Sequence, residues 1–308
     1  MTTQKHRLIT RSDFDGLVCA VLLKEIGAID ELSFVHPKDM QDGKIAVTER
    51  DIITNLPFVP GCFMAFDHHV SETQRVSELY PNYVNNPKAP SAARVVYDYY
   101  GGQKRFVNIP SELLAAVDKA DSARYSLDEI LYPSGWVLLS FLMDSRTGLG
   151  RFRDFTISNY QLMMNMVDFC RNHPVEEILA MPDVKERVNL YFEHLAKATE
   201  QIKRCAAEDG ELLILDFSQE AIIYAANRFL VYALYPKAKA SIHVMHNNTK
   251  DRIVYAVGKS IFNRSLKQSI GLLMLELGGG GHDGAGTCQI DYVNSEATLS
   301  YIKSRLRD

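Results

Sequence analysis

Short apolar runs alternate with longer apolar stretches over the first third of the chain. The run RLIT is followed by the polar segment SDFDG and then by GLVCAVLLKEIG, an order that predicts a strand, a loop and a helix ending at Gly27. Three further short runs predict strands, at residues 32–35, 51–55 and 62–66. Strands that alternate with helices favour an α/β domain with a parallel sheet and helices on both faces.

Capping residues indicate where the next helices begin and end. Ser91 precedes AARVVYDYY, which is followed by Gly101, and Ser111 precedes ELLAAVDKA. Serine is a favoured helix N-cap, and glycine commonly follows a helix end. Residues 131–181 are rich in Met and Phe and are expected to be mostly helical packing elements. The first domain is therefore expected to span residues 1–182.

The pattern changes after Pro182. An amphipathic stretch from Asp183 predicts one long helix that ends at Gly210 and connects two domains over residues 183–209. Beyond it, the apolar runs predict a smaller α/β domain over residues 210–308. Its expected elements are a strand at 211–216, a helix at 227–234, a hairpin of strands 240–246 and 252–258, a helix at 267–277 and a strand at 287–290.

Composition narrows the class of protein. The 308 residues are 46% hydrophobic and 23% charged, as in a folded globular protein. The formal net charge is −4, whereas proteins that hold duplex nucleic acid through many phosphates are usually basic. We therefore expect no duplex nucleic acid as a partner, although a local site can still bind a small anion.

Cysteine usage and the absence of long apolar stretches indicate the compartment. The 5 Cys are scattered singly, which favours buried thiols over a disulfide frame or a zinc site. The first residues lack the apolar core of a signal peptide, and no stretch approaches the length of a membrane span. We therefore expect a cytoplasmic protein without membrane contact.

Acidic and histidine residues follow two of the predicted strands. Asp13 and Asp15 lie between the first strand and the first helix, and Asp67-His68-His69 follows the strand CFMAF. Taken alone, Asp15 would simply cap the helix, and a lone His pair is usually a surface feature. Ligands of open parallel sheets bind beyond the carboxyl ends of the strands, so two such clusters together indicate a site. Carboxylates combined with imidazoles suit manganese, iron or zinc.

Asp121 is a third candidate metal ligand. It ends the predicted helix LLAAVDKAD, where the negative end of the helix dipole disfavours a carboxylate. A carboxylate in that position is a reason to expect a bound cation.

The second domain holds candidates for binding an anion. The run GGGGH consists of Gly278, Gly279, Gly280, Gly281 and His282. Such runs are often flexible linkers, but this one lies between an apolar helix and the strand TCQI. A glycine loop brings backbone N–H groups against an anion because no Cβ blocks the approach, and His282 adds a charge or a hydrogen bond. Arg264, after RIVYAVG, is either a phosphate or carboxylate ligand or an ordinary solvated arginine.

In this order, SDFDG, the strand-end DHH, AD and GGGGH resemble the motifs of the DHH phosphoesterase superfamily with a DHH-associated C-terminal domain, in particular its exopolyphosphatase-related members. The resemblance covers most of the chain. It implies an N-terminal metal-binding α/β domain and a smaller C-terminal domain that closes over the substrate across a cleft. It also implies that the metal ligands are Asp13, Asp15, His68 and Asp121.

The resemblance implies roles for further residues. Asp67 would orient the site from behind, and His69 would approach the substrate. Arg264 and the glycine run would hold the far end of the substrate.

Two positions depart from the superfamily pattern. Arg11 stands where a His ligand is usual, and Asn55 stands at the strand end where an Asp usually bridges two metals. Arginine has no lone pair to offer a metal. Losing one divalent ion removes two positive charges, and Arg11 returns one while the change of Asp to Asn at position 55 returns the other. We therefore hypothesise one ion per chain, with the Arg11 guanidinium in place of the second and Asn55 either as a metal ligand or as a residue that supports the ligands.

These features support two interpretations of function. The leading one is a metal-dependent hydrolase of a phosphoester or phosphoanhydride in polyphosphate, an oligonucleotide or a nucleotide. It would use Mn²⁺, with Mg²⁺ as the alternative, and Arg11, His69 and Arg264 would stabilise charge on the phosphoryl oxygens. The alternative is a binding or regulatory protein that keeps the site but hydrolyses weakly. The expected partners are a small phosphorylated substrate or a short single-stranded oligonucleotide, and a homodimer is compatible with the sequence.

Overall fold

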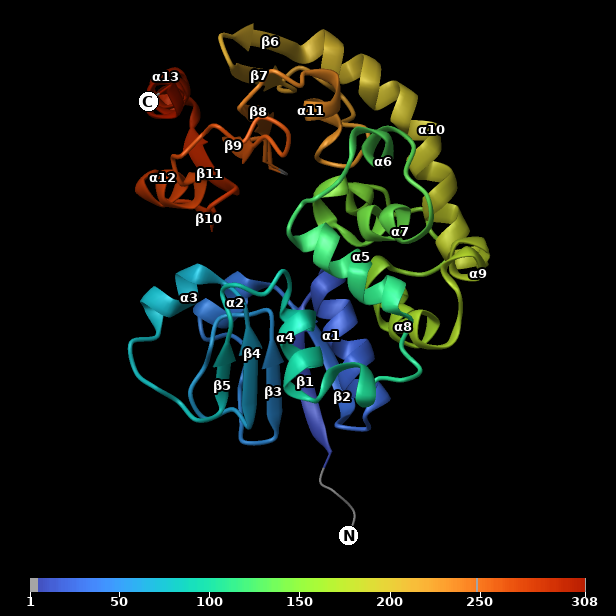
Figure 1. Ribbon diagram of the computed structural model, residues 1–308. Coiled ribbons are helices and arrows are strands. Elements are labelled where there is room, and N and C mark those ends of the chain that lie inside the picture. Colours follow the sequence, from blue (N-terminus) through green and yellow to red (C-terminus); the bar gives the residue numbers. More distant parts are fainter. Residues whose placement is uncertain (1–4, 248, 308) are drawn as a thin grey trace. The chain divides into compact units, whose positions relative to one another are not determined.

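The computed structural model describes residues 5–247 and 249–307. The chain divides into two compact units, Met1–Asn189 and Leu190–Asp308, and the boundary falls within helix α10 (Pro182–Cys205) (Figure 1). Each unit has its own sheet. None of the helices formed by the described residues combines the length and the apolarity needed to span a bilayer.

A five-stranded sheet forms the centre of the first unit, in the order β2-β1-β3-β4-β5. All neighbouring strands are parallel, which confirms the predicted parallel sheet. The strands are β1 (His6–Arg11), β2 (Ile29–Val35), β3 (Asp51–Thr54), β4 (Met64–Asp67) and β5 (Tyr83–Asn85).

Helices cover both faces of this sheet, because successive side chains along a strand point to opposite faces. On one face, Ile9, Ile53 and Ala65 form a buried cluster with Met40 of α2. On the other face, α1 packs on β1 and β2, and α4 packs on β4. The helices of this unit are α1 (Phe14–Glu25), α2 (Pro37–Gln41), α3 (Val70–Arg75), α4 (Ala92–Tyr99), α5 (Ser111–Asp121), α6 (Leu127–Leu131), α7 (Gly135–Met143), α8 (Asn159–Asn172) and α9 (Val175–Ala180), with 3₁₀ turns η1 (Gly102–Lys104), η2 (Ser145–Thr147) and η3 (Leu149–Arg151).

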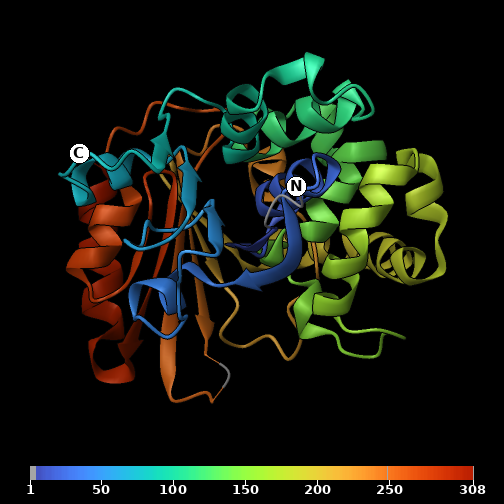
Figure 2. The same ribbon diagram turned by 90° about the horizontal axis from the view of Figure 1, so that it is seen from below.

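Helix α1 is the central helix of the first unit. Every residue from Phe14 to Leu23 is buried, which explains why its sequence is apolar around the whole helix. Its outer side packs against α5 and α8, which belong with α7 and α9 to a helical layer beside the sheet (Figure 2). The prediction that residues 131–181 are mostly helical is confirmed. The prediction that Ser111 caps α5 is wrong: Pro110 takes the cap position, and the Ser111 hydroxyl bonds to the Glu112 side chain.

The second unit contains a six-stranded sheet in the order β10-β11-β9-β8-β7-β6. The pair β7–β8 is parallel and the other neighbours are antiparallel, which confirms the predicted hairpin of β8 and β9. Helices α12 and α13 cover one face over a core that includes Ile242, Val257, Leu273 and Ile302 (Figures 1 and 2). The elements are β6 (Ala206–Asp209), β7 (Leu212–Asp216), α11 (Leu230–Leu234), β8 (Ala240–His246), β9 (Arg252–Lys259), α12 (Ile270–Glu276), β10 (Gly280–His282), β11 (Ala285–Asp291), η4 (Tyr292–Asn294) and α13 (Ser295–Arg307).

Two expectations for local structure in this region are wrong. The long helix ends at Cys205, and the next four residues form β6, because Gly210 (φ +65°) makes the tight turn that pairs β6 with β7. The glycine run is not a loop throughout, since Gly280 and Gly281 belong to the edge strand β10. This close pairing requires glycine, because a Cβ on Gly281 would lie 2.3 Å from the carbonyl oxygen of Ala285.

Candidate metal centre

The first predicted cluster lies at the junction of β1 and α1. Asp13 is the N-cap of α1, and its Oδ1 accepts a hydrogen bond from the Gly16 N–H at 2.9 Å. A Cβ on Gly16 would lie 2.0 Å from the carbonyl oxygen of Arg11, so glycine allows α1 to start against the end of β1. The alternative that Asp15 merely caps α1 is wrong, because Asp13 does so.

Asp15 holds the start of a different helix. Its carboxylate is buried and accepts hydrogen bonds from the backbone N–H groups of Ala92 and Ala93, both at 2.8 Å, in the first turn of α4. Ser91 is the N-cap of α4, as predicted, and accepts from the Arg94 N–H. Burial, and then the charge of Asp121, raise the pKa of Asp15 to about 7. The carboxylate is thus fixed in position while its negative charge is poorly compensated.

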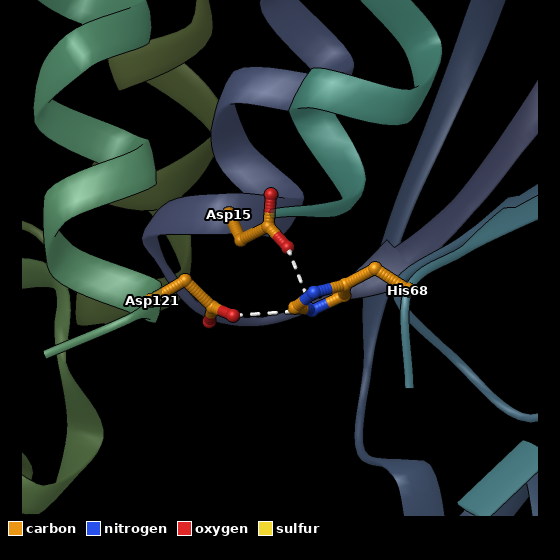
Figure 3. A group of neighbouring side chains, drawn as sticks. All are labelled: Asp15, His68 and Asp121. Carbon is orange, nitrogen blue, oxygen red and sulfur yellow. Dashed lines mark ion pairs between the residues drawn. The ribbon is translucent and has the colours of Figure 1, made fainter. Parts of the chain in front are cut away.

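His68, beyond the end of β4, faces Asp15 and Asp121 (Figure 3). Its Nε2 lies 3.1 Å from Oδ2 of Asp121 and 3.8 Å from Oδ2 of Asp15. Its Nδ1 lies 3.3 Å from the Ala89 carbonyl oxygen. A carbonyl oxygen can only accept, so Nδ1 donates and Nε2 faces the carboxylates. We call Asp15, His68 and Asp121 the metal pocket.

The three side chains of the metal pocket shift one another's pKa, and their exposure increases from the buried Asp15 through the half-buried His68 to the exposed Asp121. Burial lowers the pKa of His68, but the close contact with Asp121 and the charges of both carboxylates outweigh it and raise this pKa to about 10. Burial alone would raise the pKa of Asp121, but contact with His68 brings it below its ordinary value. Within the described chain, one proton on His68 therefore partly compensates two carboxylates.

Asp13 lies in a different setting from Asp15. Its Oδ2 lies 2.9 Å from Nε of Arg11, and its Oδ1 also accepts a hydrogen bond from Nδ2 of Asn55 at 3.0 Å. Asn55 is buried directly after β3 in a left-handed conformation (φ +55°), and its Oδ1 has no hydrogen-bond partner among the described residues. We call Arg11, Asp13 and Asn55 the arginine pocket.

Asp67 and His69 form a pair beside His68, whose ring centroid lies 4.6 Å from that of His69. Nδ1 of His69 lies 2.7 Å from Oδ1 of the buried Asp67, and the His69 carbonyl oxygen accepts from Nδ2 of Asn85 at 3.3 Å. Burial lowers the pKa of His69, but the bond to Asp67 and its charge raise it overall. The geometry is one in which Asp67 fixes the orientation of the His69 ring.

Comparison with known proteins decides the family. No family model and no curated protein matches the sequence. Among solved structures, PggH from Vibrio cholerae, a pGpG-specific phosphodiesterase, is 53% identical to this chain, covers 98% of this chain and 99% of its own, and has a TM-score of 0.84. Together with SDFDG, DHH and GGGGH, this similarity is decisive. The chain belongs to the DHH phosphoesterase superfamily.

More distant members share the fold. CDC45 from Entamoeba histolytica is 10% identical, with coverage of 99% of this chain and 96% of its own and a TM-score of 0.54. RecJ from Thermus thermophilus, in complex with Mn²⁺, is 13% identical, and the match covers 99% of this chain and 52% of the RecJ chain with a TM-score of 0.55. The 53% identity shows that the protein is a phosphoesterase, and it has a two-unit α/β fold. The alternative of a binding or regulatory protein that hydrolyses weakly is therefore less favoured.

The metal pocket of this phosphoesterase fits a divalent ion. One ligand atom from each of Asp15, His68 and Asp121 lies within 4.8 Å of the other two. Nε2 of His68 is buried and makes no hydrogen bond of acceptable geometry with any described residue. Two carboxylates and one imidazole are a donor set typical of manganese and related ions.

The predicted anion-binding residues lie in the second unit. Arg264 is exposed, and its Nε donates to the Ile261 carbonyl oxygen at 2.9 Å. Gly278 (φ +74°) and Gly279 end α12, and the Gly279 N–H donates to the Met274 carbonyl oxygen at 2.8 Å. His282 is exposed at the end of β10. Substrate binding by these residues stays a prediction.

The sequence analysis missed the groups that support the ligands. The backbone N–H groups of Ala92 and Ala93 have no side-chain signature, although Ser91 marks the start of their helix. Asp118 binds both the Ser91 hydroxyl, at 2.7 Å, and the guanidinium of Arg94, with its Nε at 3.0 Å. This pairing ties α4 to α5 one turn before Asp121. The sequence contained one sign of this support, because Asp118 lies three residues before Asp121 and therefore on the same face of α5.

Proposed function

We propose that the protein hydrolyses pGpG, a linear dinucleotide of two guanosines with a 5′-phosphate, to two molecules of GMP. The observation that supports this substrate is the 53% identity to a pGpG-specific phosphodiesterase over almost the full length of both chains. In this reaction the oxygen of water adds to the internucleotide phosphorus and the bond from phosphorus to the 3′ oxygen breaks. One proton of the water ends on the 3′ oxygen.

The metal pocket would hold one divalent ion through Asp15, His68 and Asp121. The two carboxylates match the charge of one such ion, and the imidazole nitrogen favours Mn²⁺ over Mg²⁺. When bound, the ion would supply Lewis acidity toward a phosphoryl oxygen and lower the pKa of a water molecule. The chain supplies the positioning, since backbone N–H groups of α4 fix Asp15 and the Ala89 carbonyl fixes the His68 ring.

The arginine pocket would take the place of a second ion. Both oxygens of Asp13 are engaged, one by the Arg11 guanidinium and the other by the Asn55 amide. The pocket is electrically neutral without any metal, because one guanidinium balances one carboxylate. Arg11 would then stabilise negative charge on the phosphoryl oxygens, a role that a metal ion has in two-metal sites.

His69 would act on the substrate from the side of β4. Asp67 raises the pKa of His69 and so favours the protonated ring, which can donate a hydrogen bond to a phosphoryl oxygen. Arg264 and the run Gly278, Gly279, Gly280, Gly281 and His282 are proposed to bind the far end of the dinucleotide.

Product analysis with the metal supplied tests this function. Wild-type protein with Mn²⁺ is incubated with pGpG, GpG, cyclic di-GMP, polyphosphate or GMP, and the products are separated by chromatography. We expect pGpG to be converted to GMP with a kcat/KM at least about 100-fold above that of the other compounds, and chelation of the metal to abolish the reaction. Preferential release of phosphate from polyphosphate would show that the substrate class is wrong.

A further inference from the structure

Arg146 lies in a segment to which the superfamily motifs assign no role. It belongs to η2, the short turn directly after α7. One oxygen of Asp144, Oδ1, accepts hydrogen bonds from both the backbone N–H and the Nε of Arg146, at 2.9 and 2.7 Å. Asp144 therefore caps the turn and fixes the plane of the guanidinium at the same time.

The segment that carries Arg146 is held firmly. The Thr147 side chain is buried, and its hydroxyl donates to the Phe141 carbonyl oxygen at 2.6 Å. Gly148 adopts a left-handed conformation (φ +85°) that ends the turn. The position of the guanidinium is thus set by the end of α7 and does not depend on a flexible loop.

The outer part of the guanidinium is available. The Arg146 side chain is 43% exposed, and its only hydrogen bonds to the described residues are the two that Asp144 accepts. Neither terminal nitrogen donates a hydrogen bond to the described residues. A planar fork that is fixed at Nε and open at its terminal nitrogens is suited to the oxygens of a phosphate.

The same guanidinium lies within electrostatic reach of both pockets. Burial lowers the pKa of Arg146, but the charge and hydrogen bond of Asp144, and then the charges of Asp13 and Asp121, raise it overall. The fold agrees with this proximity. Helix α5 ends in Asp121, and the hydroxyl of Tyr125, four residues further on, lies 2.9 Å from that of Ser140 in the last part of α7, which leads into η2. Arg146 thus adds positive charge beside the carboxylates that an anionic substrate must approach.

We infer that Arg146 is a phosphate-binding residue of this active site. Its terminal nitrogens donate hydrogen bonds to oxygens of the phosphate group that reacts at the metal pocket. The identity of that phosphate as the internucleotide linkage of pGpG rests on the proposed function. Asp144 is then a positioning residue, since it acts only through Arg146.

The variants Arg146→Gln and Arg146→Lys test this role, with Arg153→Gln as the matched control. Arg153 is an exposed arginine of the neighbouring segment that has no place in either pocket. We expect Arg146→Gln to raise the KM for pGpG and the inhibition constant of inorganic phosphate by roughly 10-fold or more, the effect of losing a charge-assisted hydrogen bond. Both constants should take intermediate values in Arg146→Lys, because lysine keeps the charge but lacks the planar fork of the guanidinium. Both constants of Arg153→Gln should match those of the wild type.

Calorimetric titration of the Mn²⁺-loaded proteins with inorganic phosphate separates this inference from the proposed function. Weaker phosphate binding by Arg146→Gln, with unchanged thermal unfolding, supports the role even if pGpG is not the substrate. Unchanged phosphate binding and inhibition in that variant would refute the role of Arg146, whether or not the wild type hydrolyses pGpG.

Discussion

Asp13 and Asp15 belong to one sequence motif and lie two residues apart, yet the fold gives them opposite surroundings. Asp13 receives a guanidinium and a side-chain amide from its own chain. Among the described residues, Asp15 accepts hydrogen bonds only from two backbone N–H groups, and it faces a second carboxylate across His68. The arginine pocket is therefore neutral by itself, whereas the metal pocket has two carboxylates for one imidazole, and one of the carboxylates, Asp15, is buried.

This difference indicates which carboxylates need an ion from solution. A buried carboxylate must be paired, hydrogen-bonded or protonated. Asp13 is paired within the chain, so an added cation would have to displace Arg11. The pKa of Asp15 is instead raised to about 7. A divalent ion bound in the metal pocket would replace the proton on Asp15 and so lower this pKa again. The predictions below change one pocket while the other serves as the reference.

The largest effect is expected from Asp121→Asn. This change removes the charge of one proposed ligand but no helix cap, because Asp121 contacts His68 and lies at the end of α5. Even groups that only support ligands change metal affinity by about 10- to 100-fold, so we expect at least about a 100-fold loss of both Mn²⁺ affinity and pGpG hydrolysis. Calorimetry and initial rates measure the two quantities.

Asp13→Asn is the control for that change. Asparagine remains a good N-cap, so α1 should stay intact while the pairing with Arg11 is lost. The affinity for the first Mn²⁺ ion should remain within about 10-fold of the wild type if Asp13, which the sequence analysis included among the ligands, acts only in the arginine pocket as we propose. Equal losses in Asp121→Asn and Asp13→Asn would remove the distinction between the two pockets.

The second effect should appear when the arginine pocket is converted. Arg11→His together with Asn55→Asp restores the usual ligands of the superfamily around Asp13, so the double variant should bind a second Mn²⁺ ion. Arg11→His alone lacks the bridging carboxylate, and Asn55→Asp alone places a carboxylate against Arg11. We expect a coupling between the two changes of about 1–3 kcal/mol in the binding of the second ion, as for residues in direct contact.

Isothermal titration gives the stoichiometry for the parent, both single variants and the double variant. One tight ion in the first three proteins and two in the last is the expected result. Two tight ions in the wild type, or a second ion in either single variant as tight as in the double, would refute the exchange of a metal for Arg11.

The sequence predicted the metal pocket because its ligands follow a topological rule. Asp15 and His68 come after β1 and β4, and the carboxyl ends of parallel strands lie at one edge of a sheet. The departures at Arg11 and Asn55 were visible as residue types. Their contacts with Asp13 were not, because a side-chain hydrogen bond depends on rotamers and on the left-handed backbone at Asn55.

Other features had no usable signal in the sequence. The N–H groups that hold Asp15 belong to alanines, whose side chains take no part in the bond. The segment AAED reads as the end of an amphipathic helix, and only its pairing with β7 makes it the strand β6. The glycines of β10 have the composition of a linker, yet they pair with β11 because they lack a Cβ. In each case a long-range contact decides a local structure that propensity leaves open.

The smallest effect concerns the dependence of stability on pH in the metal pocket. Folding raises the pKa of His68 to about 10 and that of Asp15 to about 7, so the metal-free native state binds protons that the unfolded chain releases. The stabilisation from His68 is complete below its unfolded pKa and is lost as the pH rises toward 10, and that from Asp15 is lost as the pH rises through 7. Bound Mn²⁺ has the opposite dependence, because it requires both groups to be deprotonated.

From about pH 6 to about pH 8.5, the Tm of the metal-free protein should fall by a few degrees relative to His68→Gln, while the Tm gain on adding Mn²⁺ should increase. Parallel Tm curves for the metal-free wild type and His68→Gln over this range would contradict the proposed protonation of the metal pocket.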